Sequence, residues 1–532
     1  MRYQGLIAAF FALVATPATA QSIAGCGTVA IPKAQLKDVG KLLSRADCFS
    51  KARAIAAGAE QASREHAATV APDPRAKLGI NVTQISYWSN EPTFANQALG
   101  IEWLDNWKSI PANRIAPDGM PKSVEKGRTL NAILIPPAPV FTGGDTTTIC
   151  KWFGTGEIWV GGERTDVSVP AARSLSFRWS QGKPPRVWLE LQSSSAADPV
   201  RDLDCRLKTD APDALFAPQL LNYLKPFGVL RFLDWSTANS NIGARWDSRG
   251  QPKGISLFGT DGAALEYQIA LANATKASPW FTTSWNADED YHRRMAQLVH
   301  DSVPAGRPVY IELSNEVWNH SFSAARQVQE EGVAAKLSDN AFQAAQHRYA
   351  QRVIEVMSIW SKVYADRPGD LVRVVATQAA NSWVGGVIMD WNGGAIRNSV
   401  DAIAIAPYFG TDLSLPGDAV ARLSDAARSQ IAKEAVAYAA LAKRTGKRLI
   451  TYEGGQHLID PSRVEAVKAA NRDPRMEGIY RQYIADWEKV SGDLMVLYSA
   501  TSAISQYGAW GLREYAGQPI AETPKLRGVV GH

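Results

Sequence analysis

The sequence predicts an α/β fold: a (β/α)8 barrel of the TIM type, with an inserted all-β domain like a sandwich and a short helical N-terminal extension. From residue 210 onward, short β-branched runs alternate with longer amphipathic stretches, which is typical of proteins with a parallel sheet. Between residues 111 and 209 the pattern changes to short strands separated by Gly, Pro and Ser. We therefore assign the alternating part to the barrel and the strand-rich part to the insertion.

The barrel prediction depends on the number of candidate strands. There are eight, and this count favours a closed barrel over an open doubly wound sheet. The segments between them, such as 290–303, 347–364 and 430–445, have apolar residues at helical spacing. Nucleotide binding has little support, because no GxGxxG opens a helix after the first strand and no GxxxxGK[ST] occurs. The candidate strands are residues 78–88, 229–235, 279–285, 308–316, 371–378, 400–409, 448–453 and 493–499.

The first 20 residues have the layout of a secretory signal peptide. Arg2 is followed by an apolar block from Leu6 to Val14 and by ATPATA, which ends in the Ala-x-Ala pattern of a cleavage site. We expect cleavage after Ala20 and export to the periplasm or the exterior. The apolar block is too short to span a bilayer, and no later stretch reaches the roughly 20 apolar residues that a spanning helix needs.

The rest of the chain divides by composition. Residues 21–77 are rich in Ala, Lys and Arg, which favours a helical N-terminal extension. We expect the barrel to start at residues 78–110, to be interrupted by the β domain at 111–209 and to resume at 210–520. The remaining residues, 521–532, form a tail.

The overall composition is ordinary for a globular protein. Hydrophobic residues make up 45% and charged residues 20% of the 532 positions, which is enough for a sizeable core. The formal net charge is +5, and the positive residues are spread along the chain rather than gathered in runs. The sequence therefore predicts neither a nucleic-acid partner nor insertion into a membrane, and we expect a monomer.

The four cysteines of an exported chain favour disulfides. The simplest of the three possible connectivities joins Cys26 to Cys48 and Cys150 to Cys205. Metal ligation has little support, because the chain contains no Cys-x-x-Cys and its histidines show no His-x-x-x-His spacing. We expect no metal and no cofactor.

Six of the 17 tryptophans lie between Trp103 and Trp188, within the β insertion or just before it. They could form a platform on which sugars stack. The alternative, which we favour, is that they fill the core of the sandwich, because they lie on strands with alternating polarity.

Two glutamates end predicted strands in a way that suits catalysis by paired carboxylates. Glu316 ends the fourth strand, in IELSNEVWN, and Glu453 ends the seventh, in RLITYEGG. In an eight-stranded ring these strands are nearly opposite, and both glutamates lie at the C-terminal face, where barrel enzymes place their chemistry. Glycoside cleavage needs two such groups, one to protonate the leaving oxygen and one to attack the anomeric carbon or activate water.

We expect different surroundings to give the two carboxyls different roles. Glu453 should stay ionised if hydrogen-bond donors reach it, and Tyr408, at the end of the preceding strand, can supply one. Glu316 should be partly protonated, first because of the nearby charge on Glu453 and then because of burial beside aromatic side chains such as Trp318.

An Asn-Glu pair ending the fourth strand, a Glu ending the seventh and a Tyr ending the sixth resemble the retaining glycoside hydrolases of clan A. This superfamily of (β/α)8 barrels includes many cellulases, mannanases and xylanases. The resemblance implies that Glu316 is the acid/base, Glu453 the nucleophile, Asn315 the residue that holds the substrate 2-hydroxyl, and Tyr408 the hydrogen-bond partner of the nucleophile. Some members carry His at the end of the third strand, where this chain has Trp285, a further candidate for substrate binding.

Other candidates for substrate binding follow strand ends. Trp510 comes after the last strand and could floor a sugar subsite, with an ordinary core position as the alternative. Asp234, Trp235 and Asn239 follow the second strand and are candidates to bind sugar hydroxyls. His457 follows the seventh strand. It could line the rim of the site, or it could donate a hydrogen bond to a carbonyl group of the loop.

Each glutamate also has a structural alternative. Glu316 could cap the next helix and Glu453 could belong to a glycine turn, but their joint occurrence favours catalysis. Glu312 shares the strand parity of Glu316, and we interpret it as half of a buried ion pair with Arg231 or Arg373.

The leading hypothesis is an exported retaining glycoside hydrolase that cleaves a β-linked polysaccharide or oligosaccharide. The alternative is a catalytically inactive carbohydrate-binding protein on a barrel scaffold. The segments LRFLDW, SNEVWN and YEGGQH also resemble exported bacterial proteins labelled cellulose-binding. The retained pair of glutamates favours the enzyme, since a binding protein needs neither, and a serine hydrolase has less support because no GxSxG elbow occurs.

Overall fold

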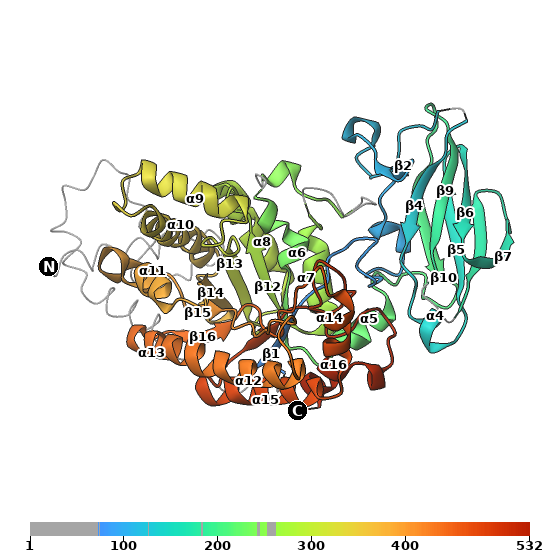
Figure 1. Cartoon of the computed structure of the whole chain (residues 1–532). Helices are drawn as coiled ribbons and strands as arrows, with labels where there is room; N and C mark the ends of the chain where they lie inside the picture. Colours follow the sequence, from blue (N-terminus) through green and yellow to red (C-terminus); the bar gives the residue numbers. More distant parts are fainter. Residues whose placement is uncertain are drawn as a thin grey trace, which may run out of the picture. The chain divides into compact units, whose positions relative to one another are not determined.

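A barrel of eight parallel strands forms the centre of the fold (Figure 1). The computed structural model describes residue 73 and residues 75–531, except 126, 182–184, 242–244 and 253–261. Around the sheet the strands follow the order β16-β15-β14-β13-β12-β11-β1-β17, so the predicted (β/α)8 fold is confirmed. Their bounds are β1 Leu78–Asn81, β11 Val229–Arg231, β12 Ser278–Thr283, β13 Val309–Leu313, β14 Leu371–Ala376, β15 Ala402–Ile405, β16 Arg448–Thr451 and β17 Met495–Leu497.

The strands are buried on both faces, which explains their continuous apolar composition. All five residues of β13 and all four of β15 are buried. Parallel strands covered by helices read as unbroken Val, Ile and Leu runs rather than as an alternation. The sheet closes where its two end strands meet: the backbone N–H of Thr451 donates to Leu494 O at 3.1 Å, and its hydroxyl donates to Val496 O at 2.9 Å.

Helices on the outside cover the barrel, as Figure 1 shows. Polar side chains cap the start of several helices. Asp288 accepts from the backbone N–H of Tyr291 at the start of α8, and Asp418 accepts from the backbone N–H groups of Val420 and Ala421 at the start of α12. The helices are α5 Pro218–Leu224, α6 Leu233–Ser236, α7 Leu265–Thr275, α8 Glu289–Ser302, α9 Ser323–Ala334, α10 Ala341–Val363, α11 Ser382–Gly394, α12 Ala419–Gln430, α13 Val436–Thr445, α14 Val464–Arg472, α15 Met476–Val490 and α16 Pro524–Val530. Shorter turns are the 3₁₀ helices η2 Gln97–Gly100, η3 Ala112–Arg114, η4 Ala238–Ser240, η5 Trp246–Ser248, η6 Pro368–Asp370, η7 Ala395–Asn398 and η9 Ile520–Glu522, and the π-helix η8 Ile431–Ala435.

Two antiparallel sheets form the insertion, in the orders β10-β5-β8-β7 and β3-β2-β4-β9-β6. Leu175, Phe177 and Trp179 alternate along β8 and lie in the core of this domain, which is separate from the barrel core. The predicted disulfide between Cys150 and Cys205 is present and joins β5 to β10. The elements are β2 Leu104–Asp105, β3 Lys108–Ser109, β4 Leu130–Leu134, α4 Pro139–Thr142, β5 Thr147–Phe153, β6 Gly156–Gly162, β7 Arg164–Ser168, β8 Ser174–Trp179, β9 Val187–Ser194 and β10 Arg201–Leu207.

The six tryptophans of the insertion divide between its core and its surface. Trp103, Trp152 and Trp179 are buried, as the core interpretation requires. The others are not: Trp107 is 53% and Trp159 36% exposed, and Trp188 is partly exposed. The core interpretation therefore holds for half of the set.

Several predicted boundaries differ from the observed elements or lie outside the described residues. The first two strands of the insertion, β2 and β3, precede residue 111, so its five-stranded sheet begins at Leu104. The tail predicted for 521–532 contains helix α16. The signal peptide, most of the extension at 21–77 and the pair of Cys26 with Cys48 lie outside the described residues.

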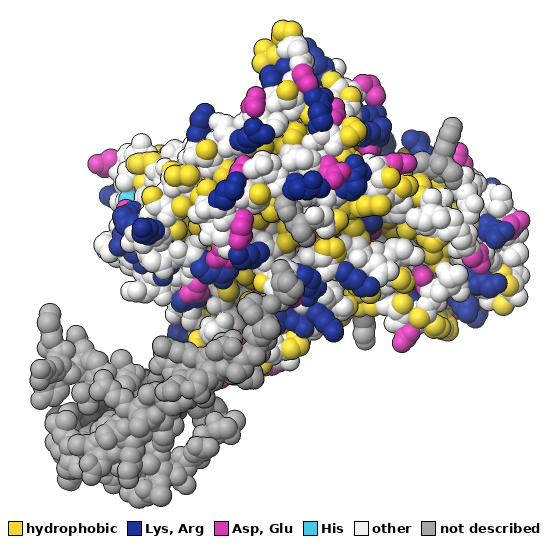
Figure 2. Space-filling view, turned by 90° about the horizontal axis from the view of Figure 1, so that it is seen from below, with side chains coloured by type: hydrophobic (Ala, Val, Ile, Leu, Met, Phe, Trp, Pro, Cys, Tyr) yellow, Lys and Arg dark blue, Asp and Glu magenta, His cyan; other side chains and the backbone are white. Residues whose placement is uncertain are grey.

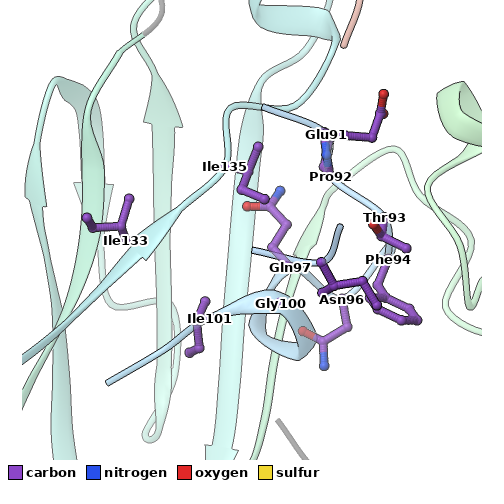
Figure 3. A pocket seen from close by; sticks show the side chains of 11 residues that line it. Glu91, Pro92, Thr93, Phe94, Asn96, Gln97, Gly100, Ile101, Ile133 and Ile135 are labelled. Carbon is purple, nitrogen blue, oxygen red and sulfur yellow. The ribbon is translucent and has the colours of Figure 1, made fainter. Parts of the chain in front are cut away.

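A pocket lies where the segment after β1 meets β4 of the insertion (Figure 3). Ile85, Phe94 and Gln97 line it from one side, and Ile133 and Ile135 from the other. Neither of the candidate catalytic glutamates belongs to this lining, so the hollow is separate from the chemistry described below.

Charged side chains of both signs are interspersed on the face that Figure 2 presents. Among the described residues, no helix is long and apolar enough to cross a membrane.

Candidate active site

Glu316 and Glu453 follow the fourth and seventh strands of the barrel, β13 and β16, at their C-terminal ends. Ser314 and Glu316 have positive φ angles of 60° and 43°, a conformation that side-chain-bearing residues adopt at a cost and that is common at functional sites. After Glu453 the chain continues through glycines. Gly455 has φ of +119°, and a Cβ there would lie 2.9 Å from the Tyr480 hydroxyl, so the turn after Glu453 requires glycine.

The Glu453 carboxylate accepts two hydrogen bonds, one from each side. The Arg231 guanidinium donates to Oε1 at 2.8 Å, and the Tyr408 hydroxyl donates to Oε2 at 2.9 Å. Burial nevertheless raises the pKa of Glu453 to about 8, and the negative charge of Glu316 adds to this rise, while Arg231 and Tyr408 oppose it. Donors reach Glu453 as expected, but burial outweighs them.

Arg231, at the end of β11, connects Glu453 to the floor of the barrel. It is fully buried and binds Glu312 through two hydrogen bonds of 3.0 and 3.2 Å, which confirms one of the two ion pairs predicted for Glu312. Arg373, the other predicted partner, pairs with Asp401 instead. A buried guanidinium between two carboxylates compensates part of their charge. Removing one of these groups would leave an uncompensated buried charge, which costs more free energy than breaking an ion pair at the surface.

The same guanidinium also orients two asparagines. It donates to Asn81 Oδ1 at 3.0 Å and to Asn315 Oδ1 at 2.9 Å. Because Arg231 occupies its oxygen, Asn315 presents its amide N–H₂, which donates to Asn239 Oδ1 at 2.9 Å. Asn315 and Asn239, two predicted substrate-binding residues, are thus brought together beside the nucleophile candidate.

Glu316 is held by different groups. The Tyr452 hydroxyl donates to Oε1 at 2.8 Å, and the Asn319 side chain donates to Oε2 at 2.9 Å. Burial and the charge of Glu316 raise the pKa of Tyr452 well above its ordinary value, so this hydroxyl keeps its proton and remains a donor. Trp318 packs near the Tyr452 ring, with centroids 6.3 Å apart. Tyr452 directly precedes Glu453 in the chain and therefore links the two carboxyl groups.

Aromatic side chains line the site beside Glu453. The Tyr408 ring lies 5.2 Å from the ring of His457, and the Trp510 ring lies 5.7 Å from His457 and 5.8 Å from Tyr498. The Trp510 indole N–H donates to His457 Nδ1 at 3.2 Å, and because an indole can only donate, this nitrogen carries no proton. Two predicted residues, Trp510 and His457, thus form one wall of the site.

The remaining predicted residues lie at different depths. Asp234 is partly exposed; burial raises its pKa to about 6, and the Tyr498 hydroxyl lies 3.4 Å from it. Trp235 is buried, and its indole N–H donates to Thr83 O. Trp285 is also buried, with its indole N–H donating to Glu331 on α9. Trp235 and Trp285 therefore pack behind the site and do not expose a ring face to a substrate.

Sequence reasoning did not foresee three of these contacts. It paired Arg231 with Glu312 alone, although an arginine on the inward face of a barrel strand is a signal that a carboxylate lies opposite. It did not single out Tyr452: in a strand that continued to Glu453, these neighbouring residues would point to opposite faces. The strand β16 ends at Thr451, before both residues, so this parity does not apply. No sequence signal marked Tyr498.

The described residues contain no group of three or more His, Cys, Asp or Glu side chains arranged to hold a metal ion. The site contains two carboxyl groups with separate sets of hydrogen-bond donors, at the C-terminal end of a (β/α)8 barrel.

Comparison with known proteins adds structural likenesses only. No family model matches the sequence, and no curated protein matches it. Among solved structures, the chain is similar to α-L-arabinofuranosidase from Thermotoga maritima, with 14% identity over 60% of this chain and 64% of that chain and a TM-score of 0.38. A family 51 arabinofuranosidase from Xanthomonas axonopodis pv. citri is 10% identical over 59% of this chain and 65% of that chain, with a TM-score of 0.41. A fungal β-1,4-galactanase is 12% identical over 59% of this chain and 91% of that chain, with a TM-score of 0.35. The chain thus spans just under two thirds of the arabinofuranosidase chains.

Proposed function

We propose that this protein is a retaining glycoside hydrolase that cleaves a β-linked polysaccharide or oligosaccharide. The observation that carries the proposal is the pair Glu316 and Glu453, which end the fourth and seventh barrel strands and are linked through Tyr452. Charge coupling between them supports a shared role, because the negative charge of Glu316 raises the pKa of Glu453. Such coupling is typical of carboxyl pairs that divide acid and nucleophile roles.

The proposed reaction has two steps. In the first, the Glu453 carboxylate attacks the anomeric carbon while Glu316 gives its proton to the glycosidic oxygen, so that the bond to the leaving sugar breaks and a glycosyl ester forms. In the second, Glu316 takes a proton from water, whose oxygen attacks the same carbon and releases Glu453. Retention requires carboxyl groups about 5 to 5.5 Å apart, which leaves no room for an intervening water.

The neighbouring side chains suit these roles. Arg231 and Tyr408 stabilise the ionised form of Glu453, which is the form that attacks. Tyr452 and Asn319 fix the orientation of Glu316. Asn315 presents N–H groups beside the nucleophile, where they can bind the sugar 2-hydroxyl.

A panel of β-linked polysaccharides tests the proposal, with Glu453→Gln as the blank. We expect the wild type to release reducing ends from at least one polymer, and Glu453→Gln to release at least a thousandfold less, because the amide cannot form the glycosyl ester. Binding without any release by the wild type would instead support a carbohydrate-binding protein.

We also propose that the protein is exported. The support is the sequence of residues 1–20, which has the layout expected of a secretory leader cleaved after Ala20. N-terminal sequencing of the protein recovered outside the cytoplasm should begin at Gln21, and recovery of the uncleaved chain from the cytoplasm alone would contradict export.

A further inference from the structure

A strip of three aromatic rings extends outward from the loop that carries Glu316. The His320 ring lies 6.5 Å from the Phe342 ring, and the Phe342 ring lies 6.4 Å from the Trp383 ring, centroid to centroid. The planes of Phe342 and Trp383 differ by only 19°. We call His320, Phe342 and Trp383 the aromatic strip.

The strip lies at the same end of the barrel as the catalytic pair. His320 follows Glu316 in the loop after β13, and Trp383 is the second residue of α11, which follows β14. Since β13 and β14 are parallel neighbours, their C-terminal ends lie side by side. Phe342 joins the two from the first turn of α10.

The strip is open to solvent. Trp383 is 51% exposed, Phe342 is partly exposed and His320 is exposed. A large aromatic surface left in water is unfavourable, and a buried indole of this size contributes strongly to binding when a ligand covers it. Three rings are too small a surface for a stable protein interface, which buries about 800 Å² on each partner. Flat, partly polar ligands such as sugar rings fit such a surface better.

The position of Glu316 decides which sugars would lie there. As the acid, Glu316 faces the glycosidic oxygen and therefore the leaving side of the substrate. Asn319 orients Glu316, and the next residue is His320, so the strip is continuous with the acid loop. The His457 ring instead lies beside Tyr408, which bonds to Glu453, and the Trp510 ring lies beside His457.

We propose that the aromatic strip binds the sugars on the leaving side of a β-linked glycan, so that the enzyme cleaves inside chains rather than at their ends. This inference rests on the proposed function for the roles of the two glutamates. It assigns the specificity for long substrates to Trp383 and Phe342.

The test compares a polymer with an aryl glycoside of the same sugar, which has no leaving-side sugars. We expect Trp383→Ala to lower the ratio of kcat/KM for the polymer to kcat/KM for the aryl glycoside about tenfold, since one aromatic contact contributes on the order of a factor of ten. Trp383→Phe should recover part of the ratio. Wild-type enzyme should reduce the viscosity of the polymer much faster than it releases reducing ends. An unchanged ratio in Trp383→Ala, or release of single sugars from chain ends, would overturn the proposal.

A matched control is Phe153→Ala, which removes an exposed aromatic ring from β5 of the insertion and should leave the ratio unchanged. The strip can also be tested without turnover, by titrating Glu453→Gln with oligosaccharides in a calorimeter. There, adding Trp383→Ala should weaken binding about tenfold. If Trp383→Ala abolished oligosaccharide binding and the wild type were inactive, the proposed hydrolase would be refuted and the strip supported. If Glu453→Gln bound oligosaccharides equally well with and without Trp383→Ala, the strip alone would be refuted.

Discussion

At the residue scale, the hydrogen-bond partners of Glu316 and Glu453 assign them different tasks, and azide can separate these tasks. If Glu453 is the nucleophile, Glu453→Ala leaves space for azide, which then attacks an activated β-glycoside from the face that Glu453 used. The product should be a glycosyl azide of inverted configuration. NMR of the product from an aryl glycoside measures this.

Glu316→Ala should give the opposite stereochemistry. A good leaving group needs little acid assistance, so the glycosyl ester on Glu453 still forms and accumulates. Azide then intercepts it and gives a product of retained configuration. If the two variants exchanged their products, the two roles would be reversed.

The Tyr408 hydroxyl sets the pH range in which Glu453 can attack. Burial raises the pKa of Glu453 to about 8, and the hydrogen bond from Tyr408 lowers it. Tyr408→Phe removes a bond to a charged group, worth about 1.5 to 3 kcal/mol, so the pKa should rise further, by about one to two units. Only ionised Glu453 attacks; the acidic limb of kcat/KM for an aryl glycoside should therefore move to higher pH by that amount.

Tyr310→Phe is the matched control for this prediction. The Tyr310 hydroxyl lies 3.5 Å from Arg448, on the first half of its strand, and bonds to neither glutamate. Its pH profile should coincide with that of the wild type. A profile for Tyr408→Phe that also coincided would show that the hydroxyl does not tune Glu453.

Much of the site was predictable because strand order and strand ends are local properties. Tyr408 donates to Glu453, and Arg231 binds Glu312, both as the pattern indicates. The bond from Arg231 to Glu453 was not predictable: these residues are 222 positions apart, and their contact depends on how far each side chain reaches across the barrel.

At the element scale, the C-terminal helix α16 supports the loop that carries Trp510. Lys525 on α16 is buried, and its ammonium group donates to Ala509 O and to Asn471 Oδ1, both at 2.8 Å. The Gln456 side chain donates to the same carbonyl. Since Ala509 precedes Trp510 and Gln456 precedes His457, these bonds hold both parts of the aromatic wall.

The buried ammonium group should make stability depend on pH. Burial lowers the pKa of Lys525 to about 7. Between pH 7 and its ordinary value near 10.4, the unfolded chain holds a proton that the folded chain lacks, so this group makes the folded state more stable as pH rises. The difference in Tm between wild type and Lys525→Met should therefore shift in favour of the wild type from pH 7 to pH 9.5, as measured by calorimetry.

Lys77→Met is the matched control. Lys77 forms an exposed ion pair with Glu488, and such pairs contribute about 0 to 1 kcal/mol. Its Tm should stay close to that of the wild type at each pH. If the Tm difference for Lys525→Met stayed constant with pH, the ammonium group would keep its charge throughout.

Element lengths were less predictable than element order. The candidate strand at 229–235 ends at Arg231, because α6 begins at Leu233 and places Asp234 and Trp235 on a helix. The candidate strand at 78–88 ends at Asn81. In both cases the apolar pattern continues past the strand, since the segments that follow are buried too, and hydrophobicity alone does not distinguish a buried turn from a strand.

At the scale of the whole molecule, one threonine side chain helps to close the barrel, beside the backbone bond from Thr451 N–H to Leu494 O. The strands β16 and β17 stand at opposite ends of the sheet order. The Thr451 hydroxyl bridges them: it donates to Val496 O at 2.9 Å and accepts from Val496 N at 2.7 Å. One threonine thus satisfies both backbone groups of its neighbour. Because Glu453 follows two residues later, closure and placement of the nucleophile depend on the same short segment.

Thr451→Val tests this closure. Valine keeps the shape of the side chain but leaves the N–H and C=O of Val496 without partners, and each buried unpaired group costs about 1 to 3 kcal/mol. We expect the free energy of unfolding, from urea titration, to fall by about 2 to 6 kcal/mol. Thr282→Val is the matched control, because the Thr282 hydroxyl in β12 is buried without a hydrogen-bond partner among the described residues. That variant should be neutral or slightly more stable, since it removes an uncompensated polar group. Equal losses in both variants would mean that the barrel is not held closed by the Thr451 hydroxyl.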